Sequence, residues 1–366
     1  MTDARDLALM DMAYGLAEKA LGCACPNPHV GAVVVKGGAV VGHGYHQGPG
    51  TAHAEAVALA RAGRRARGAT LYVTLEPCVH WGRTPPCLDA VVASGVARVV
   101  VSVVDPNPSV RNRGIQGLRR AGIAVDLGAR AERGRRLNEA YAKWIRTRRP
   151  FVTLKAALSL DGKMATRTFA SAWVSGLEAR EYMHFVRSEH DAVLVGARTA
   201  ELDDHRLTVR IPNGPRKRIL RAVLDPDLRL SPRARLLQTP EAGRVLIFTK
   251  TGTPARKASA LAERGAEVIA LPGRSNRLDL EGVLASLGQR GVTSVLVEGG
   301  GAVASSFLDL RLADRVLLSL SPLLIGGRRA VAFYAGQGAA GLSDALRLSR
   351  VSAFRVGADF IVEGYA

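Results

Sequence analysis

The sequence predicts two consecutive α/β domains. Three observations support this: a length of 366 residues, apolar runs of strand length that alternate with helical patterns, and a polar stretch, Arg146–Arg149, that ends at Pro150. Proline at that point stops a helix and favours an extended exit. We therefore expect a first domain over residues 1–147 and a second over residues 148–366.

The first domain is expected to alternate between helices and strands. A helix is predicted over residues 4–21, and the turn Gly37-Gly38 predicts a hairpin between the strands Val30–Lys36 and Ala39–His46. The remaining expected elements are a helix at His53–Gly63, a strand at Thr70–Leu75, a helix at Cys87–Ser94, a strand at Arg98–Val103, a helix at Gly114–Ala121, a strand at Ile123–Asp126 and a helix at Ala131–Ile145.

The second domain is expected to begin with a strand at Phe151–Ala157. Helices are expected between most of its later strands, and paired strands near the C-terminus. Those later strands are Ala192–Val195, Ile219–Leu224, Val245–Thr249, Glu267–Leu271, Ser294–Val297 and Arg315–Leu320.

Composition limits the class of protein. Hydrophobic residues make up 47% and charged residues 23%, a globular balance that argues against disorder. No apolar run reaches the roughly 18 residues that cross a bilayer, and the charged start does not resemble a signal peptide. We expect a cytoplasmic protein with no membrane partner. In that reducing compartment its four cysteines favour metal binding or burial over disulfides.

The formal net charge of +19 suggests an anionic partner. The basic residues are scattered, however, and no Lys/Arg block contains interleaved aromatic residues. We therefore expect no nucleic acid as a partner. A phosphorylated small molecule needs only a few of these arginines.

A zinc site is predicted from His53-Ala54-Glu55 and from two cysteines, Cys78 and Cys87. One imidazole and two thiolates supply three ligands, and a catalytic zinc site keeps its fourth position for water. Zinc lowers the pKa of that water, and Glu55 can carry its proton to a departing amine. The signature of zinc deaminases is H-x-E followed by P-C-x-x-C, and this chain has the same ligand types in the same order.

The expected local structure lets these ligands converge. Cys78 lies just beyond a strand, and Cys87 opens a helix for which Thr84 is a candidate cap. His53 also stands where a helix should begin. Cys23 and Cys25 lack such a context, and packing is their expected role.

The cysteines of the zinc motif are separated by eight residues, which departs from the short spacing of nucleoside and nucleic-acid deaminases. The surrounding segments resemble the RibD family of bifunctional riboflavin-biosynthesis deaminase/reductases, and the resemblance covers essentially the whole chain. The segments are Pro26-Asn27-Pro28-His29-Val30-Gly31, Gly44-Tyr45-His46, Glu76 to Cys87 and Asp105-Pro106-Asn107-Pro108.

The resemblance implies a cytidine-deaminase-like three-layer domain followed by a dihydrofolate-reductase-like domain. Its first implied reaction is hydrolytic deamination of 2,5-diamino-6-ribosylamino-4(3H)-pyrimidinone 5′-phosphate, a phosphorylated pyrimidine. Its second is NADPH-dependent reduction of the ribosyl group of the product to a ribityl chain. The implied cofactors are Zn²⁺ and NADPH. Four polar residues are implied contacts to the ring or phosphate, with loop-stabilising hydrogen bonds as the alternative: Asn27, His46, His80 and Asn107.

In the second domain, the site residues are predicted from the family resemblance. On its own, Gly299-Gly300-Gly301 after a strand suits either phosphate binding or a plain tight turn, and no general acid or base emerges. The resemblance implies cofactor contacts at Ala157, Trp173, Thr199, Asp203, Gly299, Gly300 and Gly301. It implies substrate contacts at Ser171, Arg187, Leu207, Arg210 and Glu298, with the phosphate held by Arg187 and Arg210.

Two departures from the family pattern fall in loops near this site. Phe169-Ala170 stands where the family usually has Gly-Glu, and His205 follows Asp204 where the family usually has proline. They leave open a deaminase whose degenerate reductase domain only binds ligand. A nucleic-acid base deaminase and a non-catalytic zinc protein are further alternatives. A homo-oligomer and the choice between NADPH and NADH are left open by the residues themselves.

Overall fold

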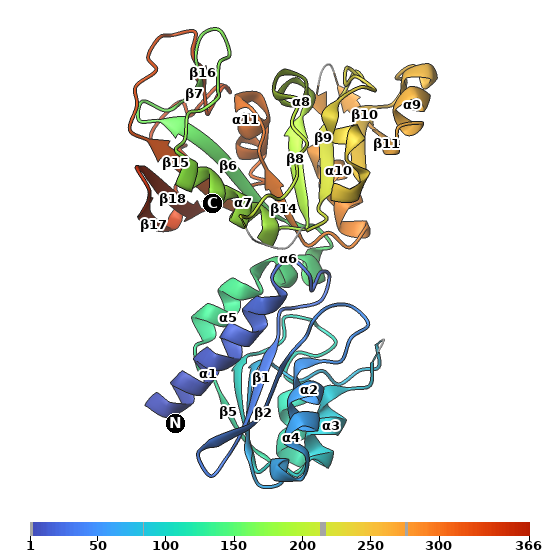
Figure 1. Ribbon diagram of the computed structural model, residues 1–366, viewed down its shortest axis with the longest axis vertical. Coiled ribbons are helices and arrows are strands. Elements are labelled where there is room, and N and C mark those ends of the chain that lie inside the picture. The colour runs from blue at the N-terminus through green and yellow to red at the C-terminus, as the bar shows by residue number, and fades with distance from the viewer. Residues whose placement is uncertain (1–2, 83, 213–216, 275–276) are drawn as a thin grey trace. The chain divides into compact units, whose positions relative to one another are not determined.

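The computed structural model describes residues 3–82, 84–212, 217–274 and 277–366. The chain divides into two compact units, one ending at Arg148 and the other beginning at Arg149 (Figure 1). Each unit contains a sheet and covering helices, so the predicted α/β class is confirmed for both. In the described ranges, no helix combines the length and the apolar character that a membrane span requires.

The first unit contains a five-stranded sheet in the order β2-β1-β3-β4-β5. Its strands are β1 (Gly31–Lys36), β2 (Ala39–Tyr45), β3 (Thr70–Leu75), β4 (Arg98–Val103) and β5 (Ala124–Leu127). β1 is antiparallel to both neighbours, whereas β3, β4 and β5 are parallel. The hairpin turn between β1 and β2 has φ of 54° at Gly37 and 87° at Gly38, the left-handed values that the predicted turn requires.

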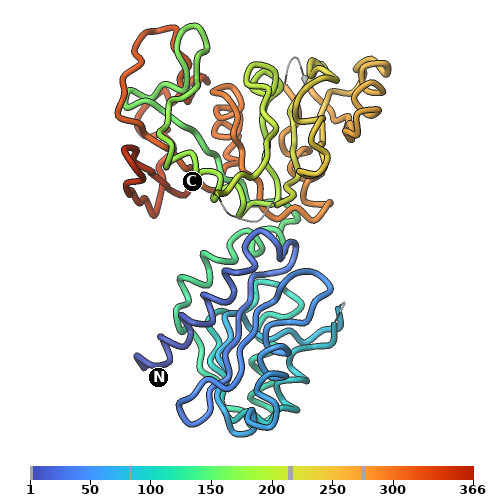
Figure 2. Tube along the Cα trace, in the orientation of Figure 1, coloured from blue at the N-terminus to red at the C-terminus, as the bar shows by residue number. Residues whose placement is uncertain are grey.

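Helices cover both faces of this sheet (Figures 1 and 2). α1 (Ala4–Ala17) and α5 (Ala131–Leu137) lie on one face, and α2 (Ala54–Ala62), α3 (Cys87–Ala93) and α4 (Arg113–Arg120) lie on the other. Alternate residues of β1 serve the two layers: Val33 packs with Tyr14 of α1, and Val34 packs with Ala58 of α2. This is the predicted three-layer arrangement.

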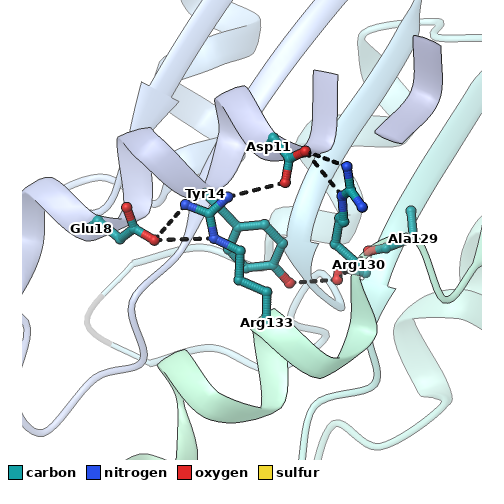
Figure 3. Close-up of polar contacts among 7 residues, drawn as sticks. Asp11, Tyr14, Glu18, Ala129, Arg130 and Arg133 are labelled. Carbon is teal, nitrogen blue, oxygen red and sulfur yellow. Dashed lines mark hydrogen bonds and ion pairs between the residues drawn. The ribbon is translucent and has the colours of Figure 1, made fainter. Parts of the chain in front are cut away.

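Ion pairs connect α1 to the segment that starts α5 (Figure 3). Asp11 bonds Arg130 at 2.6 Å and Arg133 at 3.0 Å, and Arg133 also bonds Glu18 at 2.7 Å. The Arg133 guanidinium lies 5.1 Å from the centroid of the Tyr14 ring. These side chains are part-exposed, so the network adds modest stability to a contact that apolar packing already makes.

The single helix predicted over Ala131–Ile145 is wrong. Two helices, α5 and α6 (Glu139–Thr147), meet at Asn138. The Asn138 amide is only 3% exposed; it accepts a hydrogen bond from the His29 N–H at 2.8 Å and donates one to the His29 carbonyl at 3.0 Å. An asparagine that bonds a distant backbone in this way interrupts the helix.

The first helix also ends earlier than predicted, at Ala17, and a 3₁₀ turn follows over Glu18–Ala20.

The second unit contains a nine-stranded sheet in the order β11-β10-β9-β8-β14-β6-β15-β18-β17. Its strands are β6 (Phe151–Ser159), β8 (Ala192–Gly196), β9 (Leu220–Leu224), β10 (Val245–Lys250), β11 (Ala266–Leu271), β14 (Ser294–Val297), β15 (Arg315–Ser321), β17 (Ser349–Val356) and β18 (Asp359–Tyr365). All seven predicted strands are present, and β17 with β18 forms the antiparallel pair at one edge.

Four short strands form two further ribbons, β7 (Lys163–Ala165) with β16 (Val331–Ala332) and β12 (Gly273–Arg274) with β13 (Arg277–Leu278).

Helices also cover both faces of the large sheet. α10 (Leu280–Gln289) and α11 (Gly301–Asp309) pack on one face, and α7 (Leu177–Glu189), α8 (Ala197–Asp203) and α9 (Ala255–Ala262) pack on the other. Neighbouring residues of β14 serve opposite layers, since Val295 packs beneath α10 and Leu296 packs beneath α7. α8 and α11 both begin where adjacent parallel strands, β8 and β14, end. The carboxyl edge of such a sheet is where α/β proteins bind ligands.

A buried ion pair provides a stability test of the first unit. Asp6 is 4% exposed and accepts hydrogen bonds from Arg98 at 2.7 and 2.9 Å and from the Tyr72 hydroxyl at 2.7 Å. The bonds from Arg98 lower the pKa of Asp6 to about 2. Because the folded state holds the carboxylate ionised, this stability is present above about pH 4 and is lost as the pH falls toward 2.

We predict that Asp6→Asn lowers the free energy of unfolding by about 2 kcal/mol at neutral pH. Calorimetric unfolding from neutral to acid pH measures the difference, which should shrink toward zero near pH 2. Glu132→Gln is the control, since Glu132 is 67% exposed in its pair with Arg135 and should contribute little. If the difference in the free energy of unfolding between wild type and Asp6→Asn stays constant down to pH 2, the ionised Asp6 carboxylate is not the source of this stability.

Candidate functional site

The three predicted zinc ligands converge in the first unit. His53 is the N-cap of α2, Cys87 is the first residue of α3, and Cys78 follows β3 after two intervening residues. His53 Nδ1 lies 2.9 Å from Cys87 Sγ and 3.5 Å from Cys78 Sγ. All three candidate ligand atoms lie within 4.8 Å of one another.

This donor set fits zinc. A tetrahedral zinc ion binds sulfur at about 2.3 Å and nitrogen at about 2.0–2.1 Å, so its ligand atoms lie roughly 3.5 Å apart. A hydrogen bond from the Cys87 thiol lowers the pKa of Cys78, and the same contact raises the pKa of Cys87. This contact favours one thiolate in the pair, and a cation in the same place would favour the second.

Thr84 orients His53 instead of capping a helix. The N-cap of α3 is Pro86, which makes no side-chain cap bond, so the predicted cap at Thr84 is wrong. The Thr84 hydroxyl lies 3.1 Å from His53 Nε2. When His53 binds a metal through Nδ1, its Nε2 carries the ring proton and donates a hydrogen bond to the Thr84 hydroxyl. This hydrogen bond fixes the tautomer and the orientation of the ring.

Glu55 lies beside the ligands in the first turn of α2. Its side chain is 4% exposed, and burial raises the pKa of its carboxyl to about 7. A carboxyl with that pKa can both accept and release a proton near neutral pH. The predicted general acid–base residue thus lies next to the predicted ligands.

A cavity of about 330 Å³ opens at this cluster. All four polar residues that the resemblance suggested line it: Asn27, His46, His80 and Asn107. His46 Nε2 lies 2.9 Å from the Asn27 amide nitrogen, and His46 Nδ1 lies 3.3 Å from the Ala52 carbonyl oxygen. Asn27 and His46 therefore stabilise their own loops and also face the cavity.

Two carboxylates that were not singled out hold the wall of the cavity. Glu76 accepts hydrogen bonds from the backbone N–H groups of Asp105 at 3.1 Å, Asn112 at 3.0 Å and Ile115 at 3.2 Å. Asp105 in turn accepts from the Asn107 N–H at 2.8 Å. The sequence signal was their place directly before proline in two of the matching segments.

Neither Cys23 nor Cys25 forms a disulfide. The Cys23 side chain is exposed, so the packing role expected for this residue is wrong.

In the second unit, Arg187 and Glu298 form a two-pronged ion pair. Arg187 Nε and Nη2 bond the two Glu298 carboxylate oxygens at 2.8 and 2.7 Å, and Nη1 donates to the Thr208 carbonyl at 2.6 Å. Lys155 Nζ lies 3.9 Å from the same carboxylate. Burial opposes ionisation of Glu298, but the charges of Arg187 and Lys155 outweigh it and lower the pKa of Glu298 to about 2.

Arg210 differs from Arg187. It is exposed, and its guanidinium lies 3.2 Å from His184 Nε2. In the ranges that the structure describes, no carboxylate forms an ion pair with it, and the charged groups that act on it are Arg187, Arg206, Arg235 and, with the opposite sign, Glu298. Leu207 is buried in an apolar cluster, so a substrate can meet its backbone but not its side chain.

Five of the predicted cofactor residues lie at the carboxyl edge of the sheet: Ala157, Thr199, Gly299, Gly300 and Gly301. Gly300 is the N-cap of α11, and a Cβ placed there would lie 3.5 Å from Thr199 Oγ1 of α8. At Gly301 a Cβ would lie 2.4 Å from the Ala332 carbonyl oxygen, so only glycine fits. Ala157 lies near the end of β6, the strand beside β14.

The loop with Ser171 and Trp173 follows β7. Trp173 is 70% exposed, and the Arg180 guanidinium lies 4.1 Å from its ring centroid.

Both departures from the family pattern touch this region. The Phe169 ring stacks against Arg198, 4.4 Å from its guanidinium carbon, and Arg198 directly precedes Thr199. His205 Nε2 lies 3.3 Å from a carboxylate oxygen of Asp203. Both substituted residues therefore contact α8, the helix that contains two of the predicted cofactor residues.

Comparison with known proteins identifies both units. Residues 150–362 match the family described as "RibD C-terminal domain", and residues 3–103 match the "cytidine and deoxycytidylate deaminase zinc-binding region". The riboflavin biosynthesis protein RibD of Aquifex aeolicus is 42% identical over 98% of this chain and 97% of its own. RibD of Bacillus amyloliquefaciens is 41% identical over 96% of this chain and 93% of its own.

Solved structures agree along the full length. RibD of Acinetobacter baumannii superposes with a TM-score of 0.88 at 34% identity and covers 99% of this chain and 98% of its own. A diaminohydroxyphosphoribosylaminopyrimidine deaminase/5-amino-6-(5-phosphoribosylamino)uracil reductase from Thermotoga maritima superposes with a TM-score of 0.85 at 36% identity, with the same coverage. With both units matched in one order and over nearly the whole length, this chain belongs to the RibD family of riboflavin-biosynthesis proteins.

Proposed function

We propose that this chain catalyses two successive reactions of riboflavin biosynthesis. The first unit deaminates 2,5-diamino-6-ribosylamino-4(3H)-pyrimidinone 5′-phosphate, and the second reduces 5-amino-6-(5-phosphoribosylamino)uracil with NADPH. The observation that supports this most strongly is the group His53, Cys78 and Cys87 with Glu55 buried beside it, in one chain with a reductase unit. A cytoplasmic setting is proposed because the thiolates of the site need reducing conditions.

In the deaminase, Glu55 moves the protons. Zinc bound by His53, Cys78 and Cys87 would supply a Lewis acid that lowers the pKa of a water molecule toward neutrality. Glu55 takes a proton from the attacking water and delivers it to the departing amino group. A carbon–oxygen bond forms at the ring carbon that bears the 2-amino group, the carbon–nitrogen bond breaks, and ammonia leaves. The side chains at the cavity wall, Asn27 and Asn107 among them, orient the ring.

In the reductase, charged side chains hold the sugar phosphate. The nicotinamide, when bound, supplies a hydride to C1′ of the open-chain sugar. Arg210 has no carboxylate partner in the described residues and receives the substrate phosphate, whereas Arg187 is engaged by Glu298. The backbone N–H groups at Gly300 and Gly301 begin α11 and suit the phosphates of the cofactor.

Lys155 is the proposed proton donor of the reduction. It alternates with Ala157 along β6, so both face the same side of the sheet, and both are part-exposed. Burial lowers the pKa of Lys155, which makes its ammonium a better acid than that of a free lysine. The ring oxygen of the sugar needs a proton when the ring opens, and Lys155 supplies it.

Zinc content tests the ligand set. We predict that Cys87→Ser and Cys78→Ser lose the metal and the deaminase activity together, because three donors are the minimum for a catalytic zinc site. Metal analysis of the purified proteins gives the stoichiometry, with Cys23→Ser as the matched control that keeps zinc. Full zinc retention in Cys87→Ser would remove Cys87 from the ligand set.

Glu55→Gln tests the proton transfer. The amide keeps the size of the side chain but cannot accept the proton, so deamination should fall by about two to four orders of magnitude while zinc stays bound. Reduction of the already deaminated intermediate should be unaffected, since no proposed reductase residue lies in the first unit. Near-normal deamination in this variant assigns the proton transfer elsewhere.

Arg210→Ala tests the phosphate site of the reductase. Loss of a charge-assisted hydrogen bond to phosphate should raise KM for the deaminated substrate about 10- to 100-fold. Arg264→Ala is the control, an exposed arginine of the same unit outside the proposed site. Steady-state oxidation of NADPH measures both variants. An unchanged KM in Arg210→Ala contradicts the phosphate assignment, and no oxidation in the folded wild type favours a reductase unit that only binds ligand.

A further inference from the structure

His184 is a neutral side chain among the cations of the proposed reductase site. It lies on α7, one turn before Arg187, and the charged groups that act on its imidazole are Arg187, Arg210, Lys155 and Glu298. Three of these four groups are cations. Burial together with Arg187 and Arg210 lowers the pKa of His184 to about 4, so the imidazole is uncharged at neutral pH.

The contact with Arg210 determines where this imidazole holds its proton. A guanidinium can only donate hydrogen bonds. Arg210 Nη2 lies 3.2 Å from His184 Nε2, so Nε2 must be the acceptor and cannot carry a proton. The proton of the neutral ring therefore sits on Nδ1. A doubly protonated ring would set one N–H against another and repel Arg210.

A neutral acceptor suits an arginine that must bind an anion. Arg187 shows the alternative: its guanidinium is neutralised by the Glu298 carboxylate. Arg210 is long and exposed, so an unanchored guanidinium would lose much conformational freedom on binding a ligand. The imidazole anchors one end of Arg210 without placing a negative charge against it.

His184 is not explained by packing. Its Nδ1 is shielded from solvent and has no hydrogen-bond partner in the described residues. A buried donor without a partner destabilises the folded state, so an apolar side chain would serve a core better at this position.

We propose that His184 is a positioning residue: its neutral imidazole holds the Arg210 guanidinium, without adding a negative charge, in the orientation that receives the substrate phosphate. This inference rests on the proposed function, in which Arg210 binds that phosphate. His184 acts through Arg210 and touches neither the reacting carbon nor the cofactor.

Three substitutions of His184 distinguish the effect of its hydrogen-bond acceptor from the effect of its size. His184→Gln keeps an acceptor oxygen, His184→Leu removes the acceptor, and His184→Lys places a second cation against Arg210. We expect KM for the deaminated substrate to rise about three- to tenfold in His184→Leu and more in His184→Lys, and to stay near wild type in His184→Gln. The turnover number should change less than about twofold in all three, because the chemical step is untouched.

Inorganic phosphate provides a readout that does not depend on turnover. Its inhibition constant against the substrate should rise in the same order, glutamine least and lysine most. His184→Leu should unfold at the same temperature as wild type or higher, since it removes the unpartnered donor. The double variant His184→Leu/Arg210→Ala should bind substrate no worse than Arg210→Ala alone, because His184 works through Arg210.

Each result decides one claim. Wild-type KM and phosphate inhibition in His184→Leu overturn the positioning role, and so does a glutamine variant as weak as the leucine variant. Additive losses in the double variant also overturn it, because His184 would then act without Arg210. An unchanged KM in Arg210→Ala would instead overturn the phosphate assignment of the proposed function. If His184→Leu does not fold, KM and phosphate inhibition of His184→Gln and His184→Lys test the positioning role: equal values in these two variants overturn it.

Discussion

The chemistry of the first unit depends on one geometric constraint, the meeting of three ligand atoms within 4.8 Å. His53 and Cys87 stand at the starts of α2 and α3, and Cys78 follows the carboxyl end of β3. Two of the three proposed ligands therefore stand at helix starts, which position side chains more precisely than loops do. Glu55 lies in the first turn of α2, directly after His53 at its N-cap, so the same helix start positions both side chains.

In the second unit the governing constraint is charge. The Glu298 carboxylate pairs directly with Arg187, whereas the hydrogen-bonding partner of Arg210 among the described residues is the imidazole of His184. One arginine thus fixes the architecture by ordering Glu298 and the Thr208 carbonyl, and the other is left to attract an anion. The loop residues that depart from the family pattern, Phe169 and His205, contact α8 and leave this charged cluster intact.

The sequence predicted most of the fold because buried parallel strands form continuous apolar runs, as in β4 and β14, and because the hairpin glycines need left-handed backbone. The grouping of His53, Cys78 and Cys87 was predictable from residue type and spacing. The break at Asn138 was not, since it depends on a partner 109 residues away. The roles of Thr84, Glu76 and His184 were missed for the same reason: each is defined by a contact that only the folded chain creates.

Both proposed reactions are tested most directly by the mass of the product that the zinc-loaded chain forms from the diamino pyrimidine phosphate, with and without NADPH. We expect the 2-amino group to be exchanged for oxygen without the cofactor, and the product to gain two further hydrogen atoms when NADPH is present. Unchanged substrate in both reactions, with folding and zinc content confirmed, would contradict the deaminase assignment and with it the central claim. Deaminated product that gains no hydrogen with NADPH would contradict the reductase assignment alone.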